Sequence, residues 1–242
     1  MDLKEMIYKR KSIRSFNPKE VDNIYIRKIE EFSGNLVGLN NNIKVHCEII
    51  GNDKVKGILP WRAPHYIAIF SEEKENYLTN VGFMYQQLEL YIQSLGLGTC
   101  WLGMGKYDSN FVDSESEEKF VIMIAFGKSE SELYRNNINE FKRKQLSEIA
   151  DSVDEKLEFA RLAPSAINSQ PWYFVHEENN ILHAYCANAN PITGLAIGKF
   201  NKIDMGIALA HMYVSNINTF EFLGEIEHPK IKGCSYIGSF KI

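Results

Sequence analysis

The stretch 160–174 carries the residues best suited to contact a ligand. Pro164 disfavours a helical conformation in the residue before it, and the aromatic residues from Trp172 onward favour a strand. Small and amide side chains, Asn168 among them, lie between these two signals. Small side chains let a flat ligand approach the backbone, and amides can pair with a ring that both donates and accepts hydrogen bonds. An ordinary helix-to-strand loop is the alternative, since small polar residues are common in loops.

Basic side chains form two short segments that could hold a phosphate group. Arg10 and Arg14 lie four residues apart, so a helical turn would place both on one face. Guanidinium groups match the geometry of phosphate oxygens, and Ser12 between them adds a hydroxyl. The run 142–144 is the second candidate. A solvated basic surface is the alternative for both segments.

A glycine run at residues 96–103 follows the long apolar pattern of a predicted helix. Glycine permits positive φ and close approach of the backbone to a ligand. A helix C-cap followed by a strand would explain the same glycines, and both interpretations can hold together.

The composition argues against several classes of function. A formal net charge of −4 does not suit a general polyanion binder, so nucleic acid is not an expected partner. The six histidines show no metal-ligand spacing, and the four cysteines form no CxxC pair. We therefore expect no metal and reduced thiols of a cytoplasmic protein. No apolar run approaches the ~20 residues of a membrane span, and the start lacks the apolar core of a signal peptide.

The spacing of apolar residues predicts alternating helices and strands along the chain. A Gly/Asn-rich loop is expected at residues 35–42 and a polar loop at residues 129–145. The predicted helices cover residues 2–11, 22–32, 75–95, 153–162 and 201–217, and the predicted strands cover residues 44–50, 63–70, 119–126, 172–176, 181–186, 221–227 and 234–240.

The order helix, loop, strand, long helix occurs twice, at residues 22–95 and 153–217. Gly82 of the first repeat aligns with Gly206 of the second, which is typical of an internal duplication. We therefore expect two halves, residues 1–145 and 146–242. The basic start (residues 10–14) and the glycine run belong to the first half. The loop that begins with Pro164, Ser165 and Ala166 (the Pro-Ser-Ala loop) belongs to the second. Each half thus looks like half of one binding site.

Four motifs together resemble the FMN-dependent nitroreductase family. They are the basic start at residues 10–14, the glycine run, the basic tail at residues 143–149 and the Pro-Ser-Ala loop. The resemblance implies an α+β, nitroreductase-like fold with mixed, mainly antiparallel sheets flanked by helices. The Pro-Ser-Ala loop follows the glycine run instead of preceding it. This departure fits a subgroup in which two family halves are fused, so that an internal duplication mimics the family dimer.

The resemblance implies an FMN-dependent NAD(P)H oxidoreductase. NAD(P)H would reduce FMN in a ping-pong cycle, and a small-molecule acceptor such as a nitroaromatic or quinone would then take two electrons. Because the flavin carries this chemistry, no catalytic side chain is expected. A weakly catalytic flavin-binding or redox-sensing protein and a flavin-dependent reductive dehalogenase-type enzyme are the alternatives. We expect one FMN per chain, and both a monomer acting as a pseudo-dimer and a homodimer stay open.

The same resemblance assigns residues to the cofactor. The basic start would bind the phosphate and ribityl groups, and main-chain N–H groups of the glycine run would point at the N5/O4 edge of the flavin, where fixed donors stabilise negative charge. The tail would supply a second clamp, and the Pro-Ser-Ala loop would contact the ring. The assigned residues are Arg10, Lys11, Ser12, Arg14, Leu102, Gly103, Met104, Arg143, Lys144, Pro164, Ser165, Ala166 and Asn168.

Overall fold

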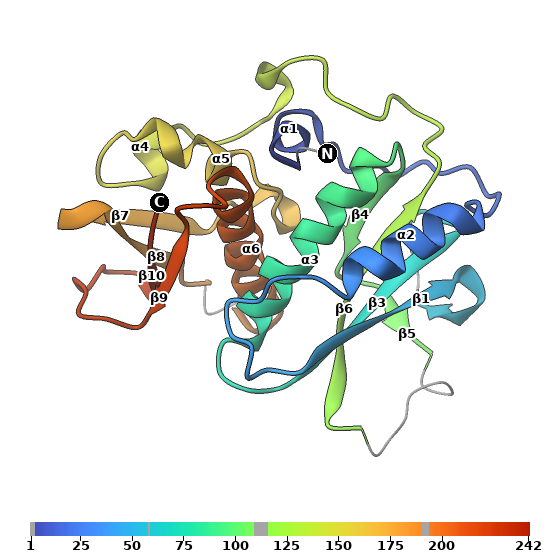
Figure 1. Cartoon of the computed structure of the whole chain (residues 1–242), viewed down its shortest axis with the longest axis horizontal. Coiled ribbons are helices and arrows are strands. Elements are labelled where there is room, and N and C mark those ends of the chain that lie inside the picture. Colours follow the sequence, from blue (N-terminus) through green and yellow to red (C-terminus); the bar gives the residue numbers. More distant parts are fainter. Residues whose placement is uncertain (1–2, 58, 109–115, 190–193) are drawn as a thin grey trace. The chain divides into compact units, whose positions relative to one another are not determined.

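A computed structural model describes residues 3–57, 59–108, 116–189 and 194–242. The chain forms two compact units. Unit 1 comprises Met1–Tyr77 and Gln87–Glu140, and unit 2 comprises Leu78–Gln86 and Phe141–Ile242. The long helix α3 (Tyr77–Ser94; Figure 1) contains the segment Leu78–Gln86, which belongs to unit 2, and its remaining residues belong to unit 1.

Unit 1 is built on an antiparallel sheet with the strand order β1-β3-β6-β4. A two-stranded sheet, β2-β5, accompanies it, and the helices α1 and α2 precede it in the sequence (Figure 1). The elements are α1 (Leu3–Lys9), α2 (Asn23–Ser33), β1 (Val45–Gly51), β2 (Val55–Lys56), β3 (His65–Glu72), β4 (Gly98–Leu102), β5 (Lys106–Tyr107) and β6 (Glu118–Gly127).

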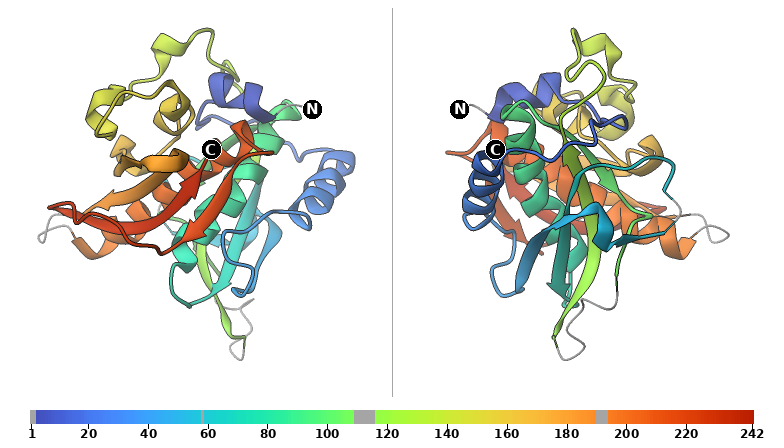
Figure 2. Two further views of the ribbon diagram at one scale, coloured as in Figure 1. Left: turned by 60° about the vertical axis from the view of Figure 1, so that its left-hand side comes forward. Right: turned by 90° about the vertical axis from the view of Figure 1, so that its right-hand side faces the viewer.

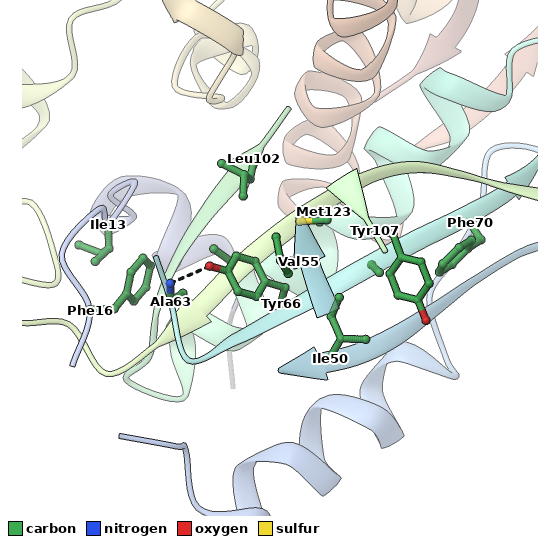
Figure 3. Close-up of a cluster of buried hydrophobic side chains, with 12 residues drawn as sticks. Ile13, Phe16, Ile50, Val55, Ala63, Tyr66, Phe70, Leu102, Tyr107 and Met123 are labelled. Carbon is green, nitrogen blue, oxygen red and sulfur yellow. Dashed lines mark hydrogen bonds between the residues drawn. The ribbon is translucent and has the colours of Figure 1, made fainter. Parts of the chain in front are cut away.

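The core of unit 1 collects apolar side chains from these strands. Tyr66 of β3 and Met123 of β6 are fully buried in it, and the rings of Phe70 and Tyr107 meet edge to face (Figure 3). The buried hydroxyl of Tyr66 accepts a hydrogen bond of 2.9 Å from the N–H of Ala63, so it does not stay unpaired in the core.

Unit 2 repeats the plan with its own antiparallel sheet, in the order β7-β8-β10-β9 (Figure 2). Asn179 and Asn180 adopt positive φ in the turn between β7 and β8, a conformation that asparagine tolerates well. Helix α6 packs on α5 and on strands β7 and β8. The elements are α4 (Leu146–Ile149), α5 (Glu158–Arg161), β7 (Trp172–Glu177), β8 (Ile181–Ala187), α6 (Gly194–Ser215), β9 (Glu221–Gly224) and β10 (Cys234–Lys241).

The two four-stranded sheets have the same topology. In each sheet the first two strands in the sequence are neighbours, and a long helix follows them. The fourth strand then lies between the second and the third. The connecting helix is α3 in one case and α6 in the other.

Two glycines let helices approach each other closely within unit 2. A Cβ atom on Gly82 of α3 would lie 2.1 Å from the carbonyl oxygen of Ile203. A Cβ atom on Gly206 of α6 would lie 2.0 Å from the carbonyl oxygen of Thr79. Each glycine therefore meets the residue three positions before the other glycine, and neither position has room for a side chain.

The predicted elements are confirmed in type and order, with changes at their ends. The first helix stops at Lys9, and α6 begins at Gly194, earlier than predicted. The helix predicted at residues 153–162 consists of a 3₁₀ turn (Glu155–Leu157) followed by the four-residue α5. The two-residue strands β2 and β5 were not predicted, because so short a strand shows no periodicity.

Candidate flavin-binding site

The basic start of unit 1 is extended beyond Lys9, where α1 ends. Ser12 forms a parallel bridge with Thr99 of β4, and the N–H of Ile13 donates to the carbonyl of Thr99 at 2.8 Å. The prediction that Arg10 and Arg14 share one helix face is therefore wrong, because these backbone contacts hold the segment against β4. The side chain of Arg10 is buried, whereas that of Arg14 is exposed.

Arg10 is part of a buried ion pair. Its Nε donates to Glu89 Oε1 of α3 at 3.3 Å, and its Nη2 donates to Ser12 Oγ at 3.1 Å. The guanidinium of Arg135 donates to the carbonyl of Arg10. Burial lowers the pKa of Arg135 to about 10, and the positive charge of Arg10 adds to that shift. Arg10 thus binds groups of its own unit.

Further hydrogen bonds around Glu89 fix the backbone of the basic start. Glu89 Oε1 also accepts from Thr99 Oγ1 at 2.7 Å and from Gln93 Nε2 at 2.6 Å. The amide of Gln93 binds both the N–H and the carbonyl of Lys11, each at 3.2 Å. The side chain of Lys11 is only 33% exposed and lies 3.9 Å from Glu132, so Arg14 is the most open cation of this segment.

The glycine run begins at the end of α3 and becomes strand β4. Gly96 has φ +83°, as expected for a C-terminal helix cap. A Cβ atom on Gly98 would lie 2.8 Å from the side chain of Ile13, so glycine at this position lets the basic start lie against β4. Leu102 is buried at the end of the strand, and the side chain of Met104 beyond it is 71% exposed.

The loop formed by residues 164–170 in unit 2 (the 164–170 loop) has a strained backbone. Ile167, Asn168 and Gln170 have φ values of +48°, +59° and +48°. Asparagine adopts this region readily, but a β-branched residue there is an outlier. The side chain of Ile167 is also 85% exposed, so burial does not compensate for its strain. Strain of this kind concentrates at ligand-binding and active sites.

The basic tail predicted as a second clamp lies against this loop. Arg143 donates from Nε to the carbonyl of Ala163 at 2.9 Å and from Nη1 to Asn168 Oδ1 at 2.6 Å. Lys144 donates from Nζ to the carbonyl of Gln170 at 2.9 Å, and its N–H donates to Gln170 Oε1 at 2.7 Å. Unit 2 therefore brings together Arg143, Lys144 and Asn168 from the predicted set.

Asp204 on α6 accepts a hydrogen bond from a main-chain N–H group of the 164–170 loop. The sequence alone did not point to this residue. The N–H of Ala166 donates to both carboxyl oxygens of Asp204, at 3.1 and 3.0 Å. Burial raises the pKa of Asp204 to about 8, and the hydrogen bonds from Ala166 and the side chain of Ser169 oppose this shift. The sequence signal was an acidic residue between the apolar positions Ile203 and Ile207 of a predicted buried helix face.

Two other classes of site can be addressed in the part of the chain that the structure describes. It contains no group of His, Cys, Asp and Glu side chains that could hold a metal ion. Among the described helices, none has the length and apolar character that crossing a membrane requires.

A family model described as "Putative TM nitroreductase" matches residues 2–216. The chain belongs to this nitroreductase family. Membership supports a general oxidoreductase function. None of the curated proteins matches the chain.

The nitroreductase fold is also found in solved structures. The structure of a protein described as a "putative nitroreductase" from Thermotoga maritima matches this chain with a TM-score of 0.63 and 19% identity, over 99% of this chain and 92% of that protein. A nitroreductase family protein from Clostridium difficile 630 has a TM-score of 0.50 and 15% identity, covering 64% of this chain and 98% of that protein. At these identities the likeness shows the fold, which confirms the predicted nitroreductase-like architecture.

Proposed function

We propose that this nitroreductase is an FMN-dependent NAD(P)H oxidoreductase that reduces a small-molecule acceptor such as a nitroaromatic or quinone. The observation that carries the proposal is the strained 164–170 loop, which has a polar hydrogen-bond framework and the family's Pro-Ser-Ala-x-Asn motif. A fold needs no exposed isoleucine at positive φ, so the loop conformation is best explained by a ligand.

Each unit contains residues that suit one part of FMN. In unit 1 the exposed guanidinium of Arg14 suits a phosphate group, and Lys11 of the same segment is proposed with it. Arg10 and Ser12 remain proposed cofactor-binding residues through the segment that they fix, because Arg10 pairs with Glu89 and donates to Ser12. Leu102, Gly103 and Met104 would supply main-chain N–H groups to the flavin edge.

In unit 2 the loop backbone from Pro164 to Asn168 would lie along the ring, because its small side chains leave the backbone accessible. Arg143 and Lys144 remain proposed cofactor-binding residues, and both also fix the loop. FMN, when bound, would supply the acceptance of a hydride and the delivery of two electrons. The protein would bind and orient the flavin and keep one of its faces open to donor and acceptor in turn.

The internal duplication is part of the proposal. It is supported by the common topology of the two sheets and by the matching contacts of Gly82 and Gly206. We propose that residues 1–145 and 146–242 are the two halves and that each chain binds one FMN. A monomer would then suffice, and a homodimer would need a separate interface. A cytoplasmic location also stays part of the proposal.

Flavin content tests the cofactor. The purified protein, reconstituted with FMN and desalted, should retain about one flavin per chain, measured as flavin absorbance against protein concentration. Arg14→Ala should release FMN, whereas Arg27→Ala, which removes another exposed arginine of unit 1, should retain it. No retained flavin in the wild type would overturn the proposal, and two flavins per chain would overturn the single site.

A further inference from the structure

We propose that Asp204 is a positioning residue that fixes the 164–170 loop in its ligand-binding conformation. The proposal rests on the flavin-binding function proposed above for that loop. Among the predicted ligand contacts Asp204 touches only the N–H of Ala166, and its carboxyl group also interacts with the side chain of Ser169, so it acts through the loop.

The contact lies where the loop backbone needs support. Ala166 begins a 3₁₀ turn, and the N–H groups at the start of such a turn have no acceptor within it. Asp204 supplies this acceptor from another element, α6, immediately before the strained Ile167. Ser165 Oγ also accepts from the N–H of Gln170 at 2.9 Å, which closes the loop on itself.

Arg143 binds carbonyl groups of the same backbone, whereas Asp204 binds an N–H group. Its guanidinium binds the carbonyls of Leu162 and Ala163 ahead of the loop and the side chain of Asn168 within it. The loop is therefore held by a carboxyl group on one N–H and by a guanidinium on its carbonyl side. A segment held in this way by two different elements keeps a backbone conformation that its own residues disfavour.

The surroundings of Asp204 show that its role is not general stabilisation. Its side chain is 3% exposed, and its neighbours Ile203, Met205 and Ile207 on α6 are buried apolar residues. Asp204 belongs to none of the ion pairs formed by residues in the described ranges. A buried carboxyl group without a cation is costly, and an apolar side chain would suit the helix better. The loop contact explains why an acid occupies this position.

The test compares Asp204→Ala and Asp204→Asn with the wild type, with Lys202→Ala as an exposed control on the same helix. Hydrogen exchange of a peptide covering residues 164–170 reports the loop, and fluorescence titration with FMN reports affinity. Asp204→Ala should speed exchange and weaken FMN binding about tenfold, the factor that corresponds to 1.4 kcal/mol. Asp204→Asn should recover part of both, because its amide oxygen can still accept from Ala166. Lys202→Ala should change neither.

Unchanged loop exchange in both folded Asp204 variants would overturn the positioning role. Equal losses in Asp204→Ala and Asp204→Asn would also overturn it, because the amide keeps the acceptor that the role requires. Circular dichroism identifies a variant that fails to fold, and the isosteric Asp204→Asn then carries the test. Failure of the wild type to bind FMN would contradict the proposed function alone, since loop exchange is measured without flavin.

Discussion

Arg10 and Glu89 form an ion pair in which neither side chain is more than 1% exposed. The distance from Nε to Oε1 is 3.3 Å, and the same carboxylate oxygen binds Thr99 and Gln93. The arginine that begins the family's basic signature is thus anchored to α3. Its first role in this chain is to fix the segment that presents Arg14 to solvent.

Arg10→Ala should lower the free energy of unfolding by about 3–5 kcal/mol, because it leaves the carboxylate of Glu89 buried without its cation. Urea denaturation followed by circular dichroism measures this loss. Arg14→Ala is the matched control, and its effect should stay within about 0.5 kcal/mol, since the side chain is exposed. Equal stability of the two variants would contradict the structural role of Arg10.

Gly206→Ala should destabilise the protein by about 1–3 kcal/mol or more, because the new Cβ atom would lie 2.0 Å from the carbonyl oxygen of Thr79. Gly198→Ala on the same helix is the control, since a Cβ atom there meets nothing within 4 Å. That change should stabilise the helix by up to about 1 kcal/mol. The opposite signs are measurable by thermal unfolding, and a stabilising Gly206→Ala would rule out the close helix crossing.

Ile167→Gly should leave stability unchanged or raise it by about 1–2 kcal/mol, because glycine adopts φ +48° without strain. Little burial is lost, as the isoleucine side chain is 85% exposed. Ile24→Gly, at an exposed position within α2, should instead cost about 1 kcal/mol. Chemical denaturation measures the change in the free energy of unfolding for both variants. If Ile167 is unstrained, the two substitutions should cost the same.

The contribution of Asp204 to the stability of the wild type should fall as pH rises from 5 to 8. Burial raises the pKa of Asp204 to about 8, far above its usual value near 4. The folded protein therefore holds a proton that the unfolded chain has released, and this contribution is lost as pH rises through the folded-state pKa. The slope should approach about 1.4 kcal/mol per pH unit from this group.

Asp204→Asn removes that titration, so urea unfolding of the variant across the same pH range should show a shallower decline. Parallel pH profiles for wild type and variant would show that Asp204 does not titrate in this window. Asp151→Asn is a suitable control. Burial raises the pKa of the Asp151 carboxyl, but the hydrogen bonds with His176 lower it by more, so its pKa lies below the usual value.

The sequence was informative wherever local chemistry decides structure. The apolar run at residues 119–126 became β6, and Gly96 capped α3 as its position predicted. The extended backbone between Arg10 and Arg14 could not be predicted, because hydrogen bonds to Thr99 and the ion pair with Glu89 override a local preference for helix.

The candidate site was predictable in its motifs but not in its supports. Asn168 and Arg143 were predicted separately, and the contact between them depends on how the chain folds. Asp204 was missed because a single acid in a helix has no motif, and its contacts with Ala166 and Ser169 arise only when the chain folds.

Anaerobic mixing of the FMN-loaded protein with NADH or NADPH tests whether a nicotinamide donor reduces the bound flavin. Flavin absorbance should bleach with at least one of the two donors at a rate that supports turnover. Addition of a nitroaromatic or quinone should then restore it. Bound flavin that neither donor reduces would contradict the oxidoreductase account and leave a flavin-binding protein without this activity.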